Sequence, residues 1–431
     1  MKVLFIAWDS PEQSYLESLF LPLFARLERR GLSIHVMQFS WGPSDAEAGA
    51  AAAARALGIR YVRESIVRRP KLLATFASVA RGAIAVRRYA LRHGIDVLMP
   101  RSTLPALMVL MARPGLGVRT LFDADGFMPD ERVDFAGWSA SGPMYRLLRE
   151  VEAEMLRGAD SVITRTAKGK AILLARAGAG TPPSKIFVIP NAKDSAEFQP
   201  LDPAARDVVR AELGIAPGAP LCVYVGTLGP QYLPDAMFRF VSAVLRRRSD
   251  TRFLVLTGQT EEAARVLGRS DVPAGAVTIR RLPPRAVARH LAAADLGLAL
   301  REPAFSQQGV SPIKVAEYLL SGLPVLTCSG VGDLDQQLDG GLMGRFVEPA
   351  NTTELDAAAD WFVNDVLERR EEARVCCRAR GVELFGLEHA TERYLDALGQ
   401  PRSLAAQANR PASGSAADAP ATGSPARVSI D

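Results

Sequence analysis

Short apolar runs alternate with amphipathic stretches along almost the whole chain. The runs are rich in Val, Ile, Leu and Phe, as is typical of parallel strands that are buried on both faces. The stretches between them repeat apolar residues every three or four positions, as amphipathic helices do. We expect strands at 2–7, 33–39, 60–62, 97–100, 119–123, 161–164 and 186–190, and then at 221–225, 252–257, 277–281, 296–300 and 323–328. This order predicts an α/β protein with two doubly wound, Rossmann-like domains.

A polar, turn-rich segment separates the two series of strands at residues 190–200. We therefore expect a first domain over 1–192 and a second domain over 193–381. An amphipathic helix is predicted over 382–398. Residues 399–431 are rich in Ala, Ser, Gly and Pro and have no periodic apolar face, so this tail is predicted to be disordered.

The composition supplies enough apolar residues for two cores, because 48% of the 431 residues are hydrophobic. Positive charge is concentrated between residues 60 and 92, where nine Lys and Arg residues stand against Glu64 alone. Apolar residues are interspersed there, and such a mixture suits an anionic membrane surface. A helix that packs by one face and turns its arginines to water explains the pattern equally well. Nucleic acid is not expected as a partner, since no binding module is recognisable.

Several classes of protein are excluded by missing motifs. No Gly-x-Gly-x-x-Gly follows the first apolar run and no Walker-type loop occurs, which argues against dinucleotide oxidoreductases and P-loop ATPases. The four cysteines have neither a disulfide framework nor zinc-ligand spacing. No uncharged apolar run of ~18 residues is present, and the N-terminal run is too short for a signal sequence. We expect a cytoplasmic protein.

The most informative stretch is 309–328, which reads as loop, helix, tight turn and strand. Ser311 is expected to cap the helix, with Pro312 at its first position. Lys314 then lies in the first turn, where the helix dipole disfavours a cation unless an anion is bound there. Lys314, Glu317, Tyr318 and Ser321 share the polar side of this helix. Glu317, one turn on from Lys314, is placed to accept hydrogen bonds from the two hydroxyls of a ribose. An ordinary amphipathic helix with both charges in water is the alternative.

The whole string from Ser311 to residue 325 resembles the donor-nucleotide segment of GT-B glycosyltransferases, particularly the retaining family 4. In that family the glutamate that matches Glu317 binds the ribose of a nucleotide sugar. Residues 190–200 also resemble the interdomain segment of these enzymes, with Ala192 in place of the usual glycine. The resemblance implies a GT-B fold with an acceptor-side domain first, a nucleotide-sugar domain second and a last helix that crosses back. It also implies retention at the anomeric carbon and no metal or other cofactor.

The resemblance assigns the donor site residue by residue. The turn after 221–225 is matched to the phosphates of the donor. The segment before 285 is matched to its base, and the loop before Glu317 to its sugar. The candidates are Gly226, Thr227, Arg281, Leu282, Gln308, Gly309, Val310, Ser311, Lys314 and Glu317. Two departures from the family are visible. No basic residue follows Gly226, and Gly309 stands where many members have a second glutamate. Either Lys314 carries more of the phosphate charge, or the donor is bound less tightly. In both cases Lys314 is expected to stabilise the leaving diphosphate.

Acidic residues follow two apolar runs of the first half. Asp9 and Asp125 are expected beside the acceptor, where either one would orient or deprotonate its hydroxyl. Residues 123–125 also match the metal-binding Asp-x-Asp of GT-A transferases, but the nucleotide signature in the second half argues against a metal there. Residues 127–132 resemble an acceptor-side loop of polysaccharide transferases.

The sequence thus predicts a glycosyltransferase that moves a sugar from a nucleotide-sugar donor to a saccharide or lipid-linked acceptor. A role in cell-surface polysaccharide or glycolipid assembly, at the inner face of the plasma membrane, is the expectation. Two alternatives stay open: an enzyme like the nucleotide-sugar 2-epimerases, and a non-catalytic nucleotide-sugar-binding homologue.

Overall fold

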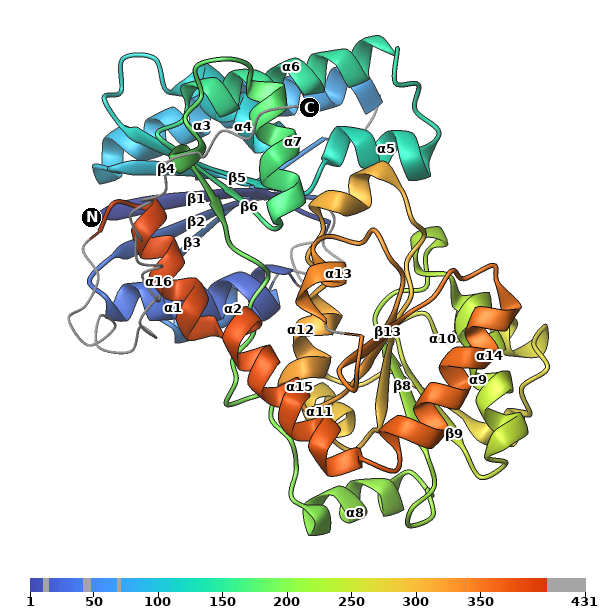
Figure 1. Ribbon diagram of the computed structural model, residues 1–431. Coiled ribbons are helices and arrows are strands. Elements are labelled where there is room, and N and C mark those ends of the chain that lie inside the picture. Colours follow the sequence, from blue (N-terminus) through green and yellow to red (C-terminus); the bar gives the residue numbers. More distant parts are fainter. Residues whose placement is uncertain (11–14, 42–47, 68–70, 339, 401–431) are drawn as a thin grey trace, which may run out of the picture.

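The chain folds into two lobes, each built around one parallel sheet (Figure 1). The structure, a computed structural model, describes residues 1–10, 15–41, 48–67, 71–338 and 340–400. Nearly all of the predicted tail at 399–431 and part of the basic segment at 60–92 lie outside these ranges. No helix in the described ranges has the length and apolar character needed to cross a membrane.

The first sheet has seven parallel strands in the order β3-β2-β1-β4-β5-β6-β7. They are β1 (Lys2–Trp8), β2 (Ser33–Ser40), β3 (Arg60–Ser65), β4 (Val97–Pro100), β5 (Arg119–Asp125), β6 (Ser161–Thr164) and β7 (Ile186–Val188). Strand β3 is an edge strand, and its register against β2 runs from His35 opposite Arg60 to Ser40 opposite Ser65.

Helices cover both faces of this sheet, as a doubly wound domain requires. One face carries α1 (Leu21–Arg29), α2 (Ala48–Ala56) and α16 (Leu387–Ala397), and the other carries α3 (Lys71–His93), α4 (Thr103–Ala112), α6 (Pro143–Gly158) and α7 (Ala167–Ala177). A further helix, α5 (Met128–Ala136), lies where the two lobes meet (Figure 1). The segment that we expected to be an acceptor-side loop at 127–132 is therefore mostly helical, with Pro129 in its first turn, where a proline is tolerated.

The second sheet has six parallel strands in the order β10-β9-β8-β11-β12-β13. They are β8 (Leu221–Val225), β9 (Arg252–Leu256), β10 (Val277–Arg280), β11 (Leu296–Ala299), β12 (Val325–Thr327) and β13 (Gly344–Phe346). Its helices are α8 (Pro203–Glu212), α9 (Pro234–Arg247), α10 (Thr260–Gly268), α11 (Pro284–Ala292), α12 (Ile313–Leu320), α13 (Leu334–Gln337), α14 (Thr352–Trp361) and α15 (Arg370–Phe385). The sequence pattern missed β13, whose three residues include a glycine and an arginine.

The helix predicted over 382–398 is two helices, α15 and α16, that meet at Gly386. Gly386 has an extended backbone, with φ −65° and ψ 133°, so the helical turn is interrupted there. Helix α15 packs on α12 of the second domain, whereas α16 packs on α1 of the first. The chain thus crosses back to the first domain at this break (Figure 1).

The two connections between the domains run side by side. The Lys193 amide donates to the Phe385 carbonyl at 2.9 Å, and the Leu387 amide donates to the Lys193 carbonyl at 3.1 Å. Lys193 and Gly386 form an isolated parallel bridge. Both crossings are therefore joined at one point.

A buried carboxylate anchors the second domain far from the interface between the lobes. Asp295, just before β11, accepts a hydrogen bond from the Leu221 amide at 2.9 Å, and its side chain is not accessible to solvent. Its ion-pair partners on α8 and α15 are Arg206, Arg210, Arg370 and Arg374. Because the carboxylate is shared among four guanidinium groups, it fixes two helices against the sheet.

Candidate functional site

The Lys314 side chain is the least satisfied cation at the junction of the lobes. Its ammonium nitrogen is buried and has no hydrogen-bond partner within the part of the chain that the structure describes, although other parts of the residue reach solvent. The nitrogen lies 4.1 Å from the ring centroid of Tyr224 and 4.4 Å from that of Tyr232. Burial holds the pKa of Lys314 well below its usual value, and the nearby charge of Arg301 lowers it further. A site of this kind is stabilised by an anion.

The turn after strand β8 lies against the Lys314 side chain. Strand β8 ends at Val225, and Gly226 follows with φ 129°, a conformation that side chains rarely adopt. A Cβ atom on Gly226 would lie 3.3 Å from the Lys314 ammonium nitrogen, so the glycine keeps the backbone close to the cation. The turn after β8 and the start of α12 therefore meet, as the sequence predicted.

Helix α12 is held against the sheet by Tyr318. The Tyr318 hydroxyl donates to the Leu298 carbonyl and accepts from the Val225 amide, both at 3.1 Å. A Cβ atom on Gly297 would lie 2.3 Å from the Tyr318 ring, so only glycine fits under it. The sequence placed Tyr318 on the polar side of the helix, but the structure buries it completely. These contacts fix the orientation of Lys314, one turn earlier.

Ser311 does not cap α12. The helix begins at Ile313 with Pro312 as its N-cap residue, and no side chain caps it. The Ser311 hydroxyl instead accepts a hydrogen bond from the Asn191 amide at 3.2 Å, and its carbonyl accepts from the Asn191 side chain at 2.7 Å. The interdomain segment thus takes the hydroxyl that the local sequence offered to the helix, and the first amides of α12 lack a side-chain acceptor.

Glu317 pairs with a cation of the interdomain segment. Lys193 lies 2.9 Å from its carboxylate, and both side chains are largely buried. The Lys193 ammonium also donates to the Ser18 carbonyl in the first domain at 3.0 Å. Glu317 is therefore close to the point where the chain crosses between domains.

The loop before α12 is packed against the first domain. The Thr166 hydroxyl donates to the Gln308 carbonyl at 2.7 Å, and a Cβ on Gly309 would lie 3.0 Å from the Phe127 ring. Val310, in the same turn, is half-buried. The backbone of this loop is thus used for contact between domains, and Gly309 provides the close approach to Phe127.

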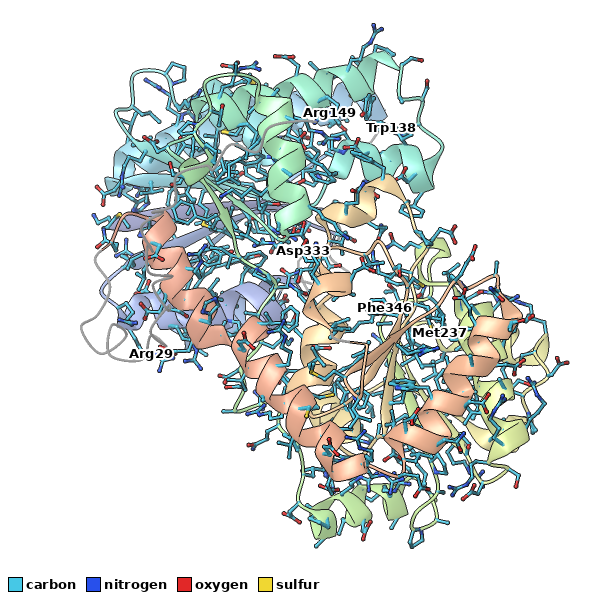
Figure 2. The ribbon with its side chains drawn as sticks, viewed as in Figure 1. Arg29, Trp138, Arg149, Met237, Asp333 and Phe346 are labelled. Atoms are coloured by element: carbon cyan, nitrogen blue, oxygen red, sulfur yellow. The ribbon has the colours of Figure 1, made fainter. Side chains whose placement is uncertain are left out.

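A carboxylate from the second domain completes this contact. Asp333, at the meeting point of the two lobes in Figure 2, accepts from the Ala167 amide at 2.5 Å and the Lys168 amide at 3.2 Å. These amides open α7, whose first turn is also capped by Thr166. The positive end of α7 therefore binds the second domain.

The remaining donor-side candidates lie further from the cation. Thr227 is exposed, and its carbonyl accepts a hydrogen bond from the Tyr224 hydroxyl. Arg281 is exposed and Leu282 is half-buried, in the connection between β10 and α11. No described contact joins these three residues to Lys314 or Glu317, so their assignment to the nucleotide stays a prediction.

The acceptor-side carboxylates form a network at the carboxyl ends of the first sheet. Arg101, just after β4, lies 3.5 Å from Asp9 and 2.6 Å from Asp125. Arg165 contacts Asp125 at 3.4 Å and binds Asp123 through both carboxylate oxygens, at 2.6 and 2.7 Å. Asp9 follows β1 and Asp125 ends β5, with β4 between these strands, so Arg101 brings together two carboxylates from the same edge of the sheet, where both were expected.

The pKa values of the two carboxyl groups are shifted in opposite directions. Burial raises the pKa of Asp9, and the single charge of Arg101 does not offset this. Burial also acts on Asp125, but Arg101 and Arg165 outweigh it, so the pKa of Asp125 is lowered. Asp9 is thus the better proton acceptor, while Asp125 is held as a carboxylate between two guanidinium groups.

A metal site of the Asp-x-Asp type does not fit this network, because arginines engage both carboxylates. The described ranges hold no group of three or more His, Cys, Asp and Glu side chains that suits a metal ion. The expectation that the reaction needs no metal stays a prediction.

Sequence reasoning missed the basic and aromatic residues at the junction. Arg301 stacks on the Tyr232 ring at 4.9 Å and donates to the Gln307 side chain at 2.6 Å. Burial raises the pKa of Tyr15 to about 12, and Tyr232 and Asp125 add to the shift, so residues of both domains lie near one another. Arg101 directly follows strand β4, and Arg301 follows strand β11 after one intervening residue, Leu300. A search for charged residues at strand ends finds both.

Comparison with known proteins agrees with this geometry. Residues 18–192 match the family model of the glycosyl transferase 4-like domain. A D-inositol 3-phosphate glycosyltransferase of Nocardia farcinica is 30% identical over 263 residues, which cover 58% of this chain and 54% of that protein. The chain thus spans about half the length of that relative. A D-inositol 3-phosphate glycosyltransferase of Gordonia bronchialis is 25% identical over 428 residues, which cover 94% of this chain and 87% of that protein.

A solved structure shows the fold. The crystal structure of Anabaena Alr3699/HepE in complex with UDP and glucose superimposes with a TM-score of 0.71. It is 14% identical, and the superposition covers 93% of this chain and 100% of that chain. The likeness confirms the predicted GT-B fold. The domain match and the relatives add that this chain is similar to family 4-like glycosyltransferases.

Proposed function

We propose that the protein transfers a sugar from a nucleotide-sugar donor, with uridine diphosphate as the leaving group, to a saccharide or lipid-linked acceptor. The observation that carries this proposal is the buried ammonium of Lys314, which has no acceptor of its own among the described residues. The superimposed Anabaena protein binds UDP and glucose, which supports a uridine donor here. Cell-surface polysaccharide or glycolipid assembly is the proposed setting.

In this proposal the diphosphate lies between the turn at Gly226 and the start of α12. Lys314 and the free amides of the helix start accept the negative charge that develops as the bond to the sugar breaks. Arg301 lies close enough to depress the pKa of Lys314, so both cations act on the same region. Glu317 binds the ribose, and retention at the anomeric carbon follows from the resemblance to family 4.

The acceptor is proposed to bind at the carboxyl ends of the first sheet. Asp9 is assigned to the acceptor hydroxyl, because its raised pKa suits a group that takes up a proton. Asp125, fixed by Arg101 and Arg165, is assigned to orient the hydroxyl.

We also propose that α3 rests on an anionic membrane surface. Leu73 and Leu91 on this helix are 72% and 64% exposed, and arginines lie beside Leu91. Co-sedimentation with phosphatidylglycerol vesicles tests this. A Leu73→Gln/Leu91→Gln variant is expected to lose binding, while Val375→Gln, a change at an equally exposed residue of α15, is expected to keep it. Equal binding by all three proteins would rule out the helix as the contact.

The donor assignment is tested by thermal shift with UDP, GDP, ADP and their sugars on wild type and Glu317→Ala. A ligand at 100 times its dissociation constant stabilises by ~2.7 kcal/mol, which is a shift of several degrees for domains of this size. We expect a shift with UDP compounds that Glu317→Ala loses and that Glu261→Ala, at an exposed residue of α10, retains. No shift with any nucleotide would overturn the donor site.

Turnover assays separate the proposal from its two alternatives. A transferase releases UDP faster when a saccharide or lipid-linked acceptor is present. An epimerase-like enzyme would convert the sugar without an acceptor. A non-catalytic homologue would bind the donor and release no nucleotide with any acceptor.

A further inference from the structure

A hollow of about 720 Å³ lies away from the transfer site, between α3 and the edge of the first sheet. Its floor is apolar and is formed by Met37 and Phe39 of β2, Val62 of β3 and Ala85 of α3. Helix α3 packs closely against α4 on this face of the sheet, toward its centre, and β3 is the edge strand. Met37 and Phe39 are almost fully buried, so the part of this apolar floor that is open to solvent is formed by the half-buried Val62 and Ala85.

Three arginines of α3 line the same hollow. Arg81, Arg88 and Arg92 are spaced seven and four residues apart, so they form one stripe along the helix. Among the described residues, none of the three guanidinium groups has a hydrogen bond or an ion pair. Arg87 differs, because its guanidinium donates to the Ala112 and Pro114 carbonyls at 3.0 and 2.7 Å. Arg87 is thus used to hold the helix, while the stripe is left unpaired.

We propose that this hollow binds a single-chain anionic amphiphile, with its hydrocarbon tail on the apolar floor and a phosphate head on the arginine stripe. The volume is in the range of small-molecule sites. Guanidinium groups suit phosphate oxygens, since they form paired, charge-assisted hydrogen bonds. Among the described residues that line the hollow, Glu64 is the one acid, against three arginines, so the field there favours an anion.

This site differs from a membrane-resting face. The exposed leucines of α3 do not line the hollow, whereas the arginine stripe does. The bound molecule is one lipid held in a defined place, so binding is saturable, has a stoichiometry of one and does not need a bilayer. The proposal does not depend on the identity of the sugar donor.

Decyl phosphate below its micelle concentration is the probe, measured by calorimetry on the full chain. We expect one saturable site, with affinity rising about fourfold for each added methylene from octyl to dodecyl phosphate. Decanol, which lacks the anion, and inorganic phosphate, which lacks the tail, are expected to bind at least tenfold more weakly.

Two variants change the hollow and one serves as the matched control. Arg88→Gln removes a phosphate contact and is expected to weaken binding about tenfold or more. Ala85→Trp fills the floor and is expected to abolish binding. Arg146→Gln, at an exposed arginine of α6 in the same domain, is expected to bind as wild type does. Unchanged UDP binding by all three variants shows that they are folded.

Three results would overturn the proposal. One is the absence of saturable binding of decyl phosphate to wild type, including the case in which only vesicles bind. Another is an affinity for decyl phosphate that stays at the wild-type value in Arg88→Gln and in Ala85→Trp. An affinity of wild type for decanol that equals its affinity for decyl phosphate would count in the same way. The third is a concentration-dependent dimer that Ala85→Trp disrupts in sedimentation, because the hollow would then be occupied by a second copy of the chain.

Discussion

Replacing Lys314 with methionine is expected to make the protein more stable and less able to bind its donor. Methionine keeps most of the length of lysine but has no ammonium group to bury. Among the described residues this ammonium has no hydrogen-bond acceptor, and it is attracted by two tyrosine rings and by the nearby charge of Glu317. The pKa of Lys314 is lowered because burial outweighs the favourable charge of Glu317.

The size of the effect follows from the missing partner. A buried polar group without a hydrogen bond costs ~1–3 kcal/mol, so a gain of ~2 kcal/mol is the central expectation. For a domain of this size each kcal/mol raises Tm by ~2–4 °C, which gives an increase of ~4–8 °C. The comparison variant is Lys193→Met, which removes a lysine that has the Glu317 carboxylate at 2.9 Å. Loss of one partner from this pair is expected to destabilise by ~3 kcal/mol.

The effect depends on pH with a defined sign. Because the pKa of Lys314 is lower in the folded protein than the ordinary lysine value, the unfolded chain binds more protons between these two values. Wild-type stability therefore rises with pH across that window, relative to Lys314→Met. The advantage of the variant is expected to be larger at pH 7 than at pH 9.5.

The test is to measure Tm by calorimetry or fluorescence for wild type, Lys314→Met and Lys193→Met, with and without UDP. Wild type is expected to gain stability from UDP, because the diphosphate supplies the missing acceptor, and Lys314→Met is expected to gain little. A lower Tm for nucleotide-free Lys314→Met than for wild type would refute the reasoning, since the ammonium would then have a favourable partner.

Three further predictions concern acidic residues. Wild type is expected to bind UDP about tenfold or more tightly than 2′-deoxy-UDP, and Glu317→Gln to lose most of this preference, as titration calorimetry would show. Activity of wild type is expected to fall as pH drops through the raised pKa of Asp9, and a pH–rate profile of Asp9→Asn to lack that limb. Asp295→Asn is expected to lose ~3–5 kcal/mol in urea denaturation, because four arginines, of which Arg210 and Arg374 are buried, lose their shared carboxylate, whereas the exposed Asp250→Asn costs ~1 kcal/mol or less.

Each of these has a result that contradicts it. A 2′-deoxy penalty that persists in Glu317→Gln would assign the ribose to another residue. An unchanged acidic limb in Asp9→Asn would remove Asp9 as the proton acceptor. Similar urea midpoints for the Asp295 and Asp250 variants would show that the four arginines do not depend on the Asp295 carboxylate for their stability.

The fold was predictable because apolar runs and helical periodicity are local properties of the chain. The Lys314–Glu317 helix was predictable for the same reason, since its spacing and its proline lie within one short segment. The structure places the Gly226 turn against this helix, as expected for two connections at the same end of a parallel sheet. Nucleotide binding by these residues stays a prediction.

What the sequence did not reveal depends on contacts between distant segments. Ser311 was predicted to cap α12, but Asn191, 120 residues away, takes its hydroxyl. Tyr318 was placed on the polar side of its helix, because its spacing does not show that Gly297 leaves room for the ring. Lys193 gave no signal of its own, since its partner Glu317 is brought near only by the docking of the domains.

The joined crossings at Lys193 and Gly386 have a mechanical consequence. Two covalent links held together at one place act as a single pivot, so the lobes can open like a jaw but have little freedom to slide. In such a rotation, displacement grows with distance from the pivot. Glu317, which lies 2.9 Å from the Lys193 ammonium, would keep its place, whereas the contact between Asp333 and α7 would be made and broken. Ribose recognition would then persist through opening and closing, while assembly of the whole site would follow the jaw angle.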